Sequence, residues 1–249
     1  DPRTSSDKKV EFTPKFGDSP LLEHHTTSLV FNDPPLHTNV RKAIGDALAP
    51  KIVAAMQQDL VDLVDDLLNN LEGKQEFDLM DDFASVIPIE VIGNLLNIDS
   101  ADRAPLRAWS AAILSALEFG LDEETLKEGN RAVEEFVEFL RGLISVRRKD
   151  LSGSDIITRL LRFKSDGFQL SDKQIYHQCI FLLNAGHETT TNLIGNGVHS
   201  LMEHPMMRRQ LSDNFDLIDG AVEEFLRFES PVQLGNRITT KAVEFETVM

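Results

Sequence analysis

Glu188 and Thr189 place a carboxylate beside a hydroxyl in the segment AGHETT, residues 185–190. A carboxylate can take up and release a proton, and a hydroxyl can hold a water molecule, so the pair is suited to moving protons toward a bound ligand. Ala185 and Gly186 come just before, and such small residues let a flat ligand approach the backbone closely. The segment therefore predicts a proton-transfer groove.

Two other interpretations apply to the same segment. His187 followed by Glu188 resembles the start of a helical zinc site, which needs a second His four residues after the first. Position 191 is Thr191, so this metal site is excluded. The remaining alternative is a helix with a tolerated glycine and surface threonines, and helical periodicity alone leaves it open.

Two further pairs could bind or neutralise charge. His37 and Arg41 are four residues apart in NDPPLHTNVRK, residues 32–42, which places both on one helix face. There they can donate charge-assisted hydrogen bonds to a carboxylate. Glu224 and Arg227 are three residues apart in EEFLRF, and this spacing predicts an ion pair that alone indicates no function.

Helices must position all these residues. Ser171 can cap a helix that carries AGHETT and continues to about residue 203. This helix would be longer than most globular helices and is apolar in its middle. We therefore expect a central helix around 171–203. The apolar spacing predicts further helices at 53–71, at 79–96 with an interruption at Pro88, at 100–117, at 122–149, and after a cap at Ser154. Residues 1–33 read as irregular, and the alternation in residues 237–248 predicts a strand.

Composition limits the class of protein. With 249 residues and 41% hydrophobic residues, the chain can bury a core, and we expect one domain over residues 1–249. A net charge of −16 disfavours nucleic acid and anionic membranes as partners. The sequence shows neither an apolar run long enough to span a membrane nor a secretory signal, so a cytoplasmic location is the expectation.

The order of these motifs resembles the cytochrome P450 family. In that family an (A/G)-G-x-(D/E)-T-(T/S) pattern lies on the long helix that crosses the distal face of the haem, and a Glu-x-x-Arg pair lies on a later helix. Residues 185–190 match the first pattern, and Glu224 with Arg227 matches the second. His37 and Arg41 match the helix that binds haem propionates, and Arg237 in LGNRIT matches a third propionate contact.

The resemblance implies a fold and an activity. The fold is mainly α with minor β, as a partial cytochrome P450 fold, and the activity is that of a haem-thiolate monooxygenase of the bacterial soluble type. Such an enzyme inserts oxygen from O₂ into a small apolar substrate, with electrons from a ferredoxin- or flavodoxin-type partner. By the same resemblance Glu188 and Thr189 are catalytic, and Glu224 with Arg227 is a structural ion pair. The implied haem-binding residues are His37, Arg41, Ala185, Gly186 and Arg237.

The thiolate ligand is where the sequence departs from the family. Family members carry it in a glycine-rich loop well after the Glu-x-x-Arg helix, and this sequence ends 22 residues after Arg227. Cys179, the single cysteine, lies on the distal-face helix and is predicted to be a small buried hydrophobe. We therefore expect a truncated segment of a P450 domain, inactive alone, whose thiolate lies outside these residues.

Two alternatives to the enzyme remain at this stage. A truncated, catalytically silent helical protein could bind a hydrophobic ligand or a protein partner, and an unrelated helical bundle is also open. The apolar stretch AWSAAILSALEF, residues 108–119, is compatible with a greasy ligand or with a helix face packed on the core. The substrate, its site of oxidation and the electron donor are not indicated by the sequence.

Overall fold

Helices make up most of the computed structural model, which describes residues 3–118 and 120–244. The predicted mainly α fold with minor β is confirmed, because the described strands are two short segments that pair with each other. The contacts divide the chain into two compact units, each described here by itself. Unit 1 comprises the described parts of Asp1–Ile52, Ala108–Leu182 and Gly235–Met249, and unit 2 comprises Val53–Arg107 and Leu183–Leu234.

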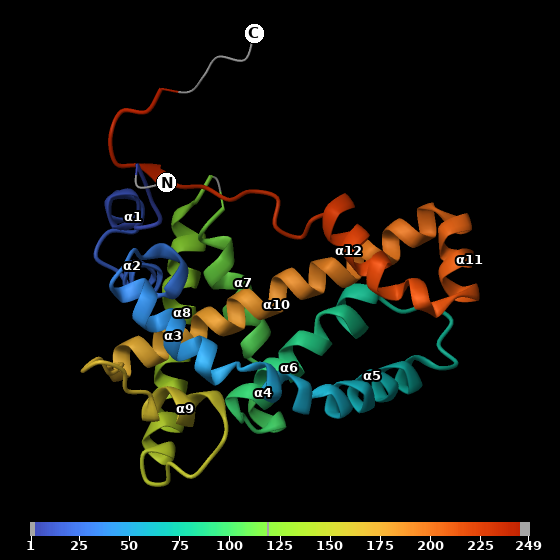
Figure 1. Ribbon diagram of the computed structural model, residues 1–249, viewed down its shortest axis with the longest axis horizontal. Coiled ribbons are helices and arrows are strands. Elements are labelled where there is room, and N and C mark those ends of the chain that lie inside the picture. Colours follow the sequence, from blue (N-terminus) through green and yellow to red (C-terminus); the bar gives the residue numbers. More distant parts are fainter. Residues whose placement is uncertain (1–2, 119, 245–249) are drawn as a thin grey trace. The chain divides into compact units, whose positions relative to one another are not determined.

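The elements follow one another along the chain as labelled in Figure 1. The α-helices are α1 Lys9–Phe16, α2 Pro20–Thr27, α3 Leu36–Ala47, α4 Pro50–Ala55, α5 Gln57–Leu71, α6 Val86–Leu96, α7 Leu106–Ser115, α8 Glu123–Arg147, α9 Ile156–Arg162, α10 Asp172–Glu203, α11 Pro205–Asp213 and α12 Ile218–Phe228. The other elements are β1 Thr4–Ser5, β2 Ile238–Thr239, the π-helix η2 Met80–Ala84, and the 3-10 helices η1 Leu29–Phe31, η3 Ser100–Asp102 and η4 Phe215–Leu217.

The core of unit 1 is built on α8. Its buried stripe contains Val133, Phe136, Leu140 and Ile144, which recur at the three- and four-residue spacing of one helix face. The helix begins at Asp122, whose carboxylate accepts a hydrogen bond from the Thr125 backbone N–H. α2 and α9 both pack against α8, so the long helix organises the helices around it.

Gly129 lets α8 approach its neighbours closely. A Cβ at this position would lie 2.9 Å from Leu21 Cδ1 and 3.2 Å from the backbone oxygen of Ala112. We expect Gly129→Ala to lower the free energy of unfolding, because an overpacking cost of about 1–3 kcal/mol exceeds the gain of about 1 kcal/mol in helix propensity. Gly142→Ala on the same helix is the matched control, since nothing lies within 4 Å of its added Cβ.

Urea denaturation followed by circular dichroism measures the free energy of unfolding of both glycine variants. The control variant is expected to be stabilised by about 1 kcal/mol, which is the propensity gain without a clash. If both variants were stabilised equally, the close approach at Gly129 would be contradicted.

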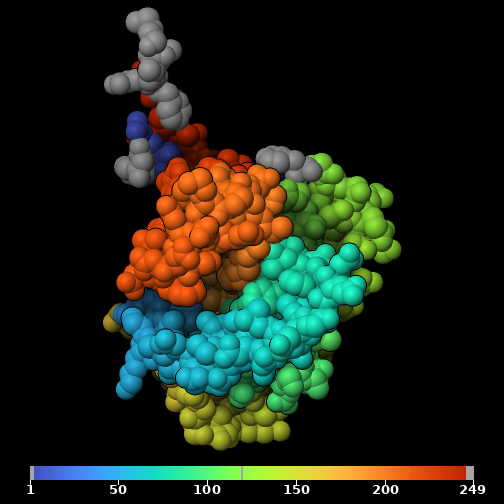
Figure 2. All heavy atoms as spheres, turned by 90° about the vertical axis from the view of Figure 1, so that its right-hand side faces the viewer, coloured from blue at the N-terminus to red at the C-terminus, as the bar shows by residue number. Residues whose placement is uncertain are grey.

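Unit 2 contains a surface helix and a buried one. α5 has no buried residue, and Figure 2 shows it as a continuous strip of blue to cyan spheres on the visible face. α6 instead buries most of its residues, including Ile87, Ile92 and Leu96, and packs against α5 and η2. α6 is therefore the core helix of this unit.

α10 is the predicted long helix, and it runs without interruption over 32 residues, as Figure 1 shows. The Ser171 hydroxyl accepts a hydrogen bond from the Gln174 backbone N–H, and the Gln174 side chain in turn accepts from the Ser171 N–H. Ser171 is therefore the N-terminal cap, as the sequence predicts. Unit 1 ends at Leu182 within this helix, and Leu183 belongs to unit 2.

Several expected boundaries are wrong. Residues 1–33 are not irregular, because they contain α1 and α2. The helix expected at 79–96 is interrupted, but at Ser85 between η2 and α6, and Pro88 lies in the first turn of α6, where a proline needs no N–H partner. Asp155 rather than Ser154 caps α9, since its carboxylate accepts from the Thr158 N–H.

Two further elements differ from the expectation. The helix expected over residues 53–71 is divided at Met56 into α4 and α5. The strand expected over residues 237–248 is limited to β2 among the described residues, and residues 245–248 lie outside them. No helix in the described part of the chain is both long and apolar enough to cross a membrane.

Candidate functional site

Ala185, Glu188 and Thr189 share one face of α10 within unit 2. They are spaced three and four residues apart, Ala185 and Glu188 are exposed, and Thr189 is half-buried. The Thr189 hydroxyl donates a hydrogen bond to the Ala185 backbone oxygen at 2.8 Å. The small-residue face with its carboxylate and hydroxyl is therefore present, and α10 continues through it.

Gly186 has a close packing contact with α6. A Cβ at this position would lie 2.8 Å from Ile92 Cδ1, so α6 fills the space beside the glycine. The open surface of this helical turn is at Ala185, which points away from the buried position of His187. Any ligand on this face of unit 2 would therefore contact Ala185 more directly than Gly186.

His187 belongs to the buried side of the same segment. Burial lowers the pKa of its imidazole from 6.5, and the positive charge of Arg107 lowers it further. The side chain is therefore neutral at pH 7 and does not carry a proton to the exposed face. Of the two ionisable side chains in residues 185–190, only Glu188 is exposed.

A second group of predicted residues gathers in unit 1. His37 is half-buried and Arg41 exposed, one turn apart on α3, and Arg237 directly precedes β2. β1 pairs with β2 so that Ser5 lies opposite Ile238. The antiparallel register brings Arg237 to the segment that follows β1, although the two are far apart in sequence.

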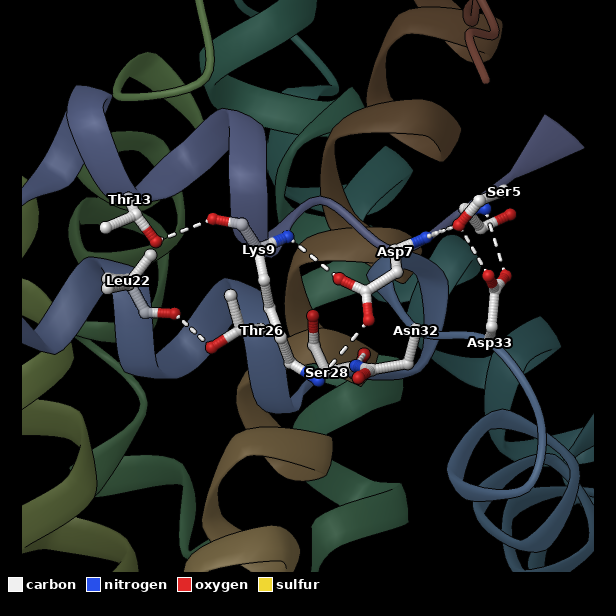
Figure 3. A network of polar contacts seen from close by, with 10 residues as sticks. Ser5, Asp7, Lys9, Thr13, Leu22, Thr26, Ser28, Asn32 and Asp33 are labelled. Carbon is white, nitrogen blue, oxygen red and sulfur yellow. Dashed lines mark hydrogen bonds and ion pairs between the residues drawn. The ribbon is translucent and has the colours of Figure 1, made fainter. Parts of the chain in front are cut away.

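Asp33 lies where the charges of His37 and Arg237 act on its carboxylate. Its carboxylate accepts hydrogen bonds from the Ser5 hydroxyl at 2.5 Å and from the Ser6 N–H at 3.0 Å, within the network shown in Figure 3. These two bonds lower the pKa of Asp33, and the positive charges of His37 and Arg237 lower it further. His37 and Arg237, two of the cations that the sequence identified, therefore act on a carboxylate that sequence reasoning missed.

The predicted ion pair on α12 in unit 2 is present in a two-point geometry. Arg227 donates from Nε to Glu224 Oε2 and from Nη2 to Oε1, both at 2.7 Å. These hydrogen bonds lower the pKa of Glu224 and raise that of Arg227. Both side chains are exposed, so the pair is a fixed charge doublet on the helix surface.

Cys179 is fully buried, as predicted. Burial raises the pKa of its thiol to about 12, so it is a neutral thiol at pH 7 and a poor metal ligand. Within residues 3–118 and 120–244, no three His, Cys, Asp or Glu side chains gather in a way that could hold a metal ion.

The apolar stretch at residues 108–118 packs on the core of unit 1. Ser110, Ile113 and Ala116 are fully buried, and Trp109 stacks on Phe136 with ring centroids 5.0 Å apart. Of the two interpretations that the sequence left open, this contact favours the core-facing helix. Residue 119 lies outside the described residues.

Asp33 is the residue of this site that the sequence could have indicated. It stands in the segment NDPP, four residues before His37, which places the two side chains one helical turn apart if the helix extends that far. Its contacts with Ser5 and Ser6 join residues that are far apart in the sequence, so no local sequence pattern indicates them.

Comparisons with known proteins agree with the resemblance. The sequence model described as Cytochrome P450 matches residues 107–220. The curated protein Cytochrome P450 107B1 of Saccharopolyspora erythraea is 38% identical over 234 residues, which is 94% of this chain and 55% of that protein.

Solved structures match the fold over almost the whole chain. The crystal structure of P450BioI, in complex with an acyl carrier protein ligated to hexadec-9Z-enoic acid, superposes with a TM-score of 0.92 at 30% identity, over 100% of this chain and 63% of that one. The ligand-free structure of cytochrome P450 TbtJ1 superposes with a TM-score of 0.82 at 31% identity, over 98% of this chain and 68% of that one. The chain spans about half the length of the curated relatives it matches, 54% and 55% in two cases.

Proposed function

The chain belongs to the cytochrome P450 family, and we propose that it forms a large part of a cytoplasmic haem-thiolate monooxygenase. Such an enzyme inserts one oxygen atom from O₂ into an apolar organic substrate with electrons from a separate redox protein. The thiolate ligand would come from residues beyond those printed here. When bound, haem supplies the oxygen-activating chemistry, and the residues of this chain supply binding and proton handling.

The observation that carries this proposal is the cationic group of unit 1. Arg41 and Arg237 carry only N–H donors and His37 adds a ring N–H, which is the chemistry that two propionate carboxylates require. The pKa of Asp33 is lowered first by the hydrogen bonds from Ser5 and Ser6, and the smaller contributions of His37 and Arg237 support a positive field at this position. We propose that these cations would bind the haem propionates, with Asp33 holding them in position.

The proton-handling residues lie on α10. The Thr189 hydroxyl proton is directed at the Ala185 carbonyl, so its oxygen can accept a hydrogen bond from water. The exposed Glu188 carboxylate can take a proton from solvent and pass it to that water. We propose that Glu188 and Thr189 act as a relay, that Ala185 and Gly186 form the face against the cofactor, and that Glu224 with Arg227 has a structural role.

Apolar substrates and a small electron-transfer partner follow from the family. P450BioI has been solved with an acyl carrier protein ligated to hexadec-9Z-enoic acid, and this long apolar chain supports an apolar substrate for the present protein. A ferredoxin- or flavodoxin-type protein is the proposed electron donor, by the same resemblance.

The reduced carbon monoxide difference spectrum tests the proposal. The printed chain and the product of its complete reading frame are each supplied with haem, and only the longer protein is expected to give the thiolate signature. In that protein, His37→Ala is expected to lower haem retention during gel filtration, because one propionate partner is lost. Lys127→Ala is the matched control, since this exposed lysine lies on α8 and is not one of the proposed propionate partners.

Two outcomes would contradict the proposal. Absence of the thiolate signature from the complete product would favour a catalytically silent binding protein. Equal haem retention in the His37 variant and the Lys127 variant would remove the proposed role of the unit 1 cations.

A further inference from the structure

A concave surface lies between α3 and the end of α9, entirely within unit 1. α3 and α9 pack against each other, and the cavity beside them has a volume of about 480 Å³. This size is within the range of about 300–1,000 Å³ typical of small-molecule sites. Its lining includes Lys42, Asp46, Arg159, Arg162, Phe163 and Lys164.

The charge of this pocket is opposite to that of the whole protein. Four of the lining side chains are cationic and one is anionic, whereas the chain carries a net charge of −16. Like charges brought together without a ligand repel one another, so such a group in an acidic protein is unusual. The pocket is therefore a local site of attraction for an anion.

The two arginines are held in place but not neutralised. Arg159 donates from Nε to the Ser154 backbone oxygen at 2.7 Å, and Arg162 donates from Nη2 to the Gly153 backbone oxygen at 3.0 Å. A carbonyl orients a guanidinium without cancelling its charge, and each guanidinium keeps further N–H donors. Among the described carboxylates, none forms an ion pair with Arg159, Arg162 or Lys164.

Lys42 differs from these three cations. Its Nζ donates to the Ser165 hydroxyl at 2.5 Å and lies 3.6 Å from Asp166 Oδ2. This contact ties the loop after α9 to α3 and closes one side of the pocket. Lys42 therefore shapes the site, and the uncompensated charge comes from Arg159, Arg162 and Lys164.

Phe163 adds an apolar surface beside the cations. It is half-buried and follows directly on the last residue of α9. We propose that this pocket binds a small organic phosphate, whose phosphoryl oxygens accept hydrogen bonds from Arg159, Arg162 and Lys164 and whose organic group contacts Phe163. Guanidinium groups match phosphate oxygens in a forked geometry, and an aromatic ring favours a planar or apolar organic part.

A small ligand fits this surface better than an acidic protein does. The cations line a cavity, and both guanidinium groups are oriented by backbone carbonyls. Arg159 is half-buried while Arg162 and Lys164 are exposed, so a small ligand that enters the cavity can reach all three cations, whereas a protein surface would meet mainly the exposed pair. The proposed site is separate from the haem site and uses none of the residues that we propose to bind haem.

Calorimetric titration of the printed chain with phenyl phosphate tests the proposal. At low salt we expect a dissociation constant at or below about 1 mM, and weaker binding of inorganic phosphate, which lacks the group that contacts Phe163. Arg162→Gln is expected to weaken phenyl phosphate binding about tenfold and Lys164→Gln about fivefold. Lys164 makes no hydrogen bond in the described structure, so its variant is expected to fold normally.

Lys127→Gln is the charge-matched control. It removes one exposed lysine near the start of α8 that does not line the pocket. The change should alter the affinity for phenyl phosphate less than about twofold. Acylation of lysines followed by mass spectrometry locates the ligand, because phenyl phosphate should protect Lys164 and leave Lys127 reactive.

Four results would overturn the proposal. Absence of phenyl phosphate binding at about 10 mM would exclude the site. Equal weakening by Lys164→Gln and Lys127→Gln would show attraction by overall charge only. Equal affinity for phenyl and inorganic phosphate would remove the role of Phe163. Binding of a decaglutamate peptide without binding of phenyl phosphate would assign the surface to an acidic protein instead.

Discussion

Acidification from about pH 7.5 to about pH 5 is expected to lower the free energy of unfolding by about 2 kcal/mol through His25 alone. The pKa of this imidazole is lowered from 6.5 to about 3, first because the side chain is buried and then because Lys15 and His177 are nearby charges. The rings of Phe12, Phe16 and Phe31 surround it, with centroids 5.3–5.8 Å from its own. An imidazolium in this aromatic setting would lose its hydration without gaining a partner.

The direction of the effect follows from proton uptake. Above pH 6.5 the imidazole is neutral in both the folded and the unfolded chain, so the full stability is present. As the pH falls below 6.5, the unfolded chain binds a proton that the folded chain refuses until about pH 3. Stability is therefore lost between these two values, at about 1.4 kcal/mol for each pH unit.

Two neighbouring histidines act in the same direction. Burial lowers the pKa of His24 well below 6.5, and the nearby His25 and His177 lower it further. Burial also lowers the pKa of His177, although its Nε2 lies 2.9 Å from Glu23, which opposes the shift. The total loss on acidification should therefore exceed that from His25.

His25→Phe isolates the contribution of one proton. This change keeps an aromatic ring among the three phenylalanines and removes an Nε2 that has no hydrogen-bond partner among the described residues. Urea denaturation of both proteins at several pH values should show their difference in unfolding free energy changing by about 2 kcal/mol between pH 7.5 and pH 5. Phe31→Leu is the control, since it disturbs the same cluster without removing a titrating group, and its difference should not depend on pH.

A pH-independent difference for His25→Phe would contradict this account. It would mean that the imidazole is protonated equally in the folded and unfolded chain. A slope shared by His25→Phe and Phe31→Leu would instead indicate a general weakening of unit 1 in acid.

The long helices could be predicted because their signals are local. The Ser171 cap and the run of helix formers after it fix α10, and the apolar stripe from Val133 to Ile144 fixes α8. α1 and α2 could not be predicted in this way. Each has only eight residues, too few to be stable alone, and they depend on the packing of Phe12, Phe16 and His25.

The residues of the candidate site also differ in whether a local sequence pattern could predict them. The spacing of His37 and Arg41 and that of Glu224 and Arg227 are properties of a helix, so the sequence could show them. The position of Asp33 depends on Ser5 and Ser6, and that of Arg237 depends on the pairing of β2 with β1. Long-range pairing leaves no periodicity in the sequence, so neither position could be predicted.

Thr189→Ala, made in the complete enzyme, is expected to lower substrate oxidation at least about tenfold while haem content stays unchanged. The reason is the position of the hydroxyl rather than its effect on the helix. Its proton is donated to Ala185 and its oxygen is left to hold a water beside Glu188. Without that oxygen, the proton-relay role that we propose for the pair is lost, and more of the consumed O₂ should leave as hydrogen peroxide. Product and peroxide formed for each O₂ consumed are the measurements.

Thr190→Ala provides the matched control, because Thr190 is exposed on the next face of α10 and loses the same methyl and hydroxyl groups. Its product yield should remain close to that of the parent enzyme. Thr189→Ser should restore most of the yield, since it keeps the hydroxyl that bonds to the Ala185 carbonyl. Equal losses at positions 189 and 190 would indicate a general weakening of the helix. A normal yield in Thr189→Ala would move the proton pathway away from this face, because Glu188 would then need no hydroxyl to hold its water.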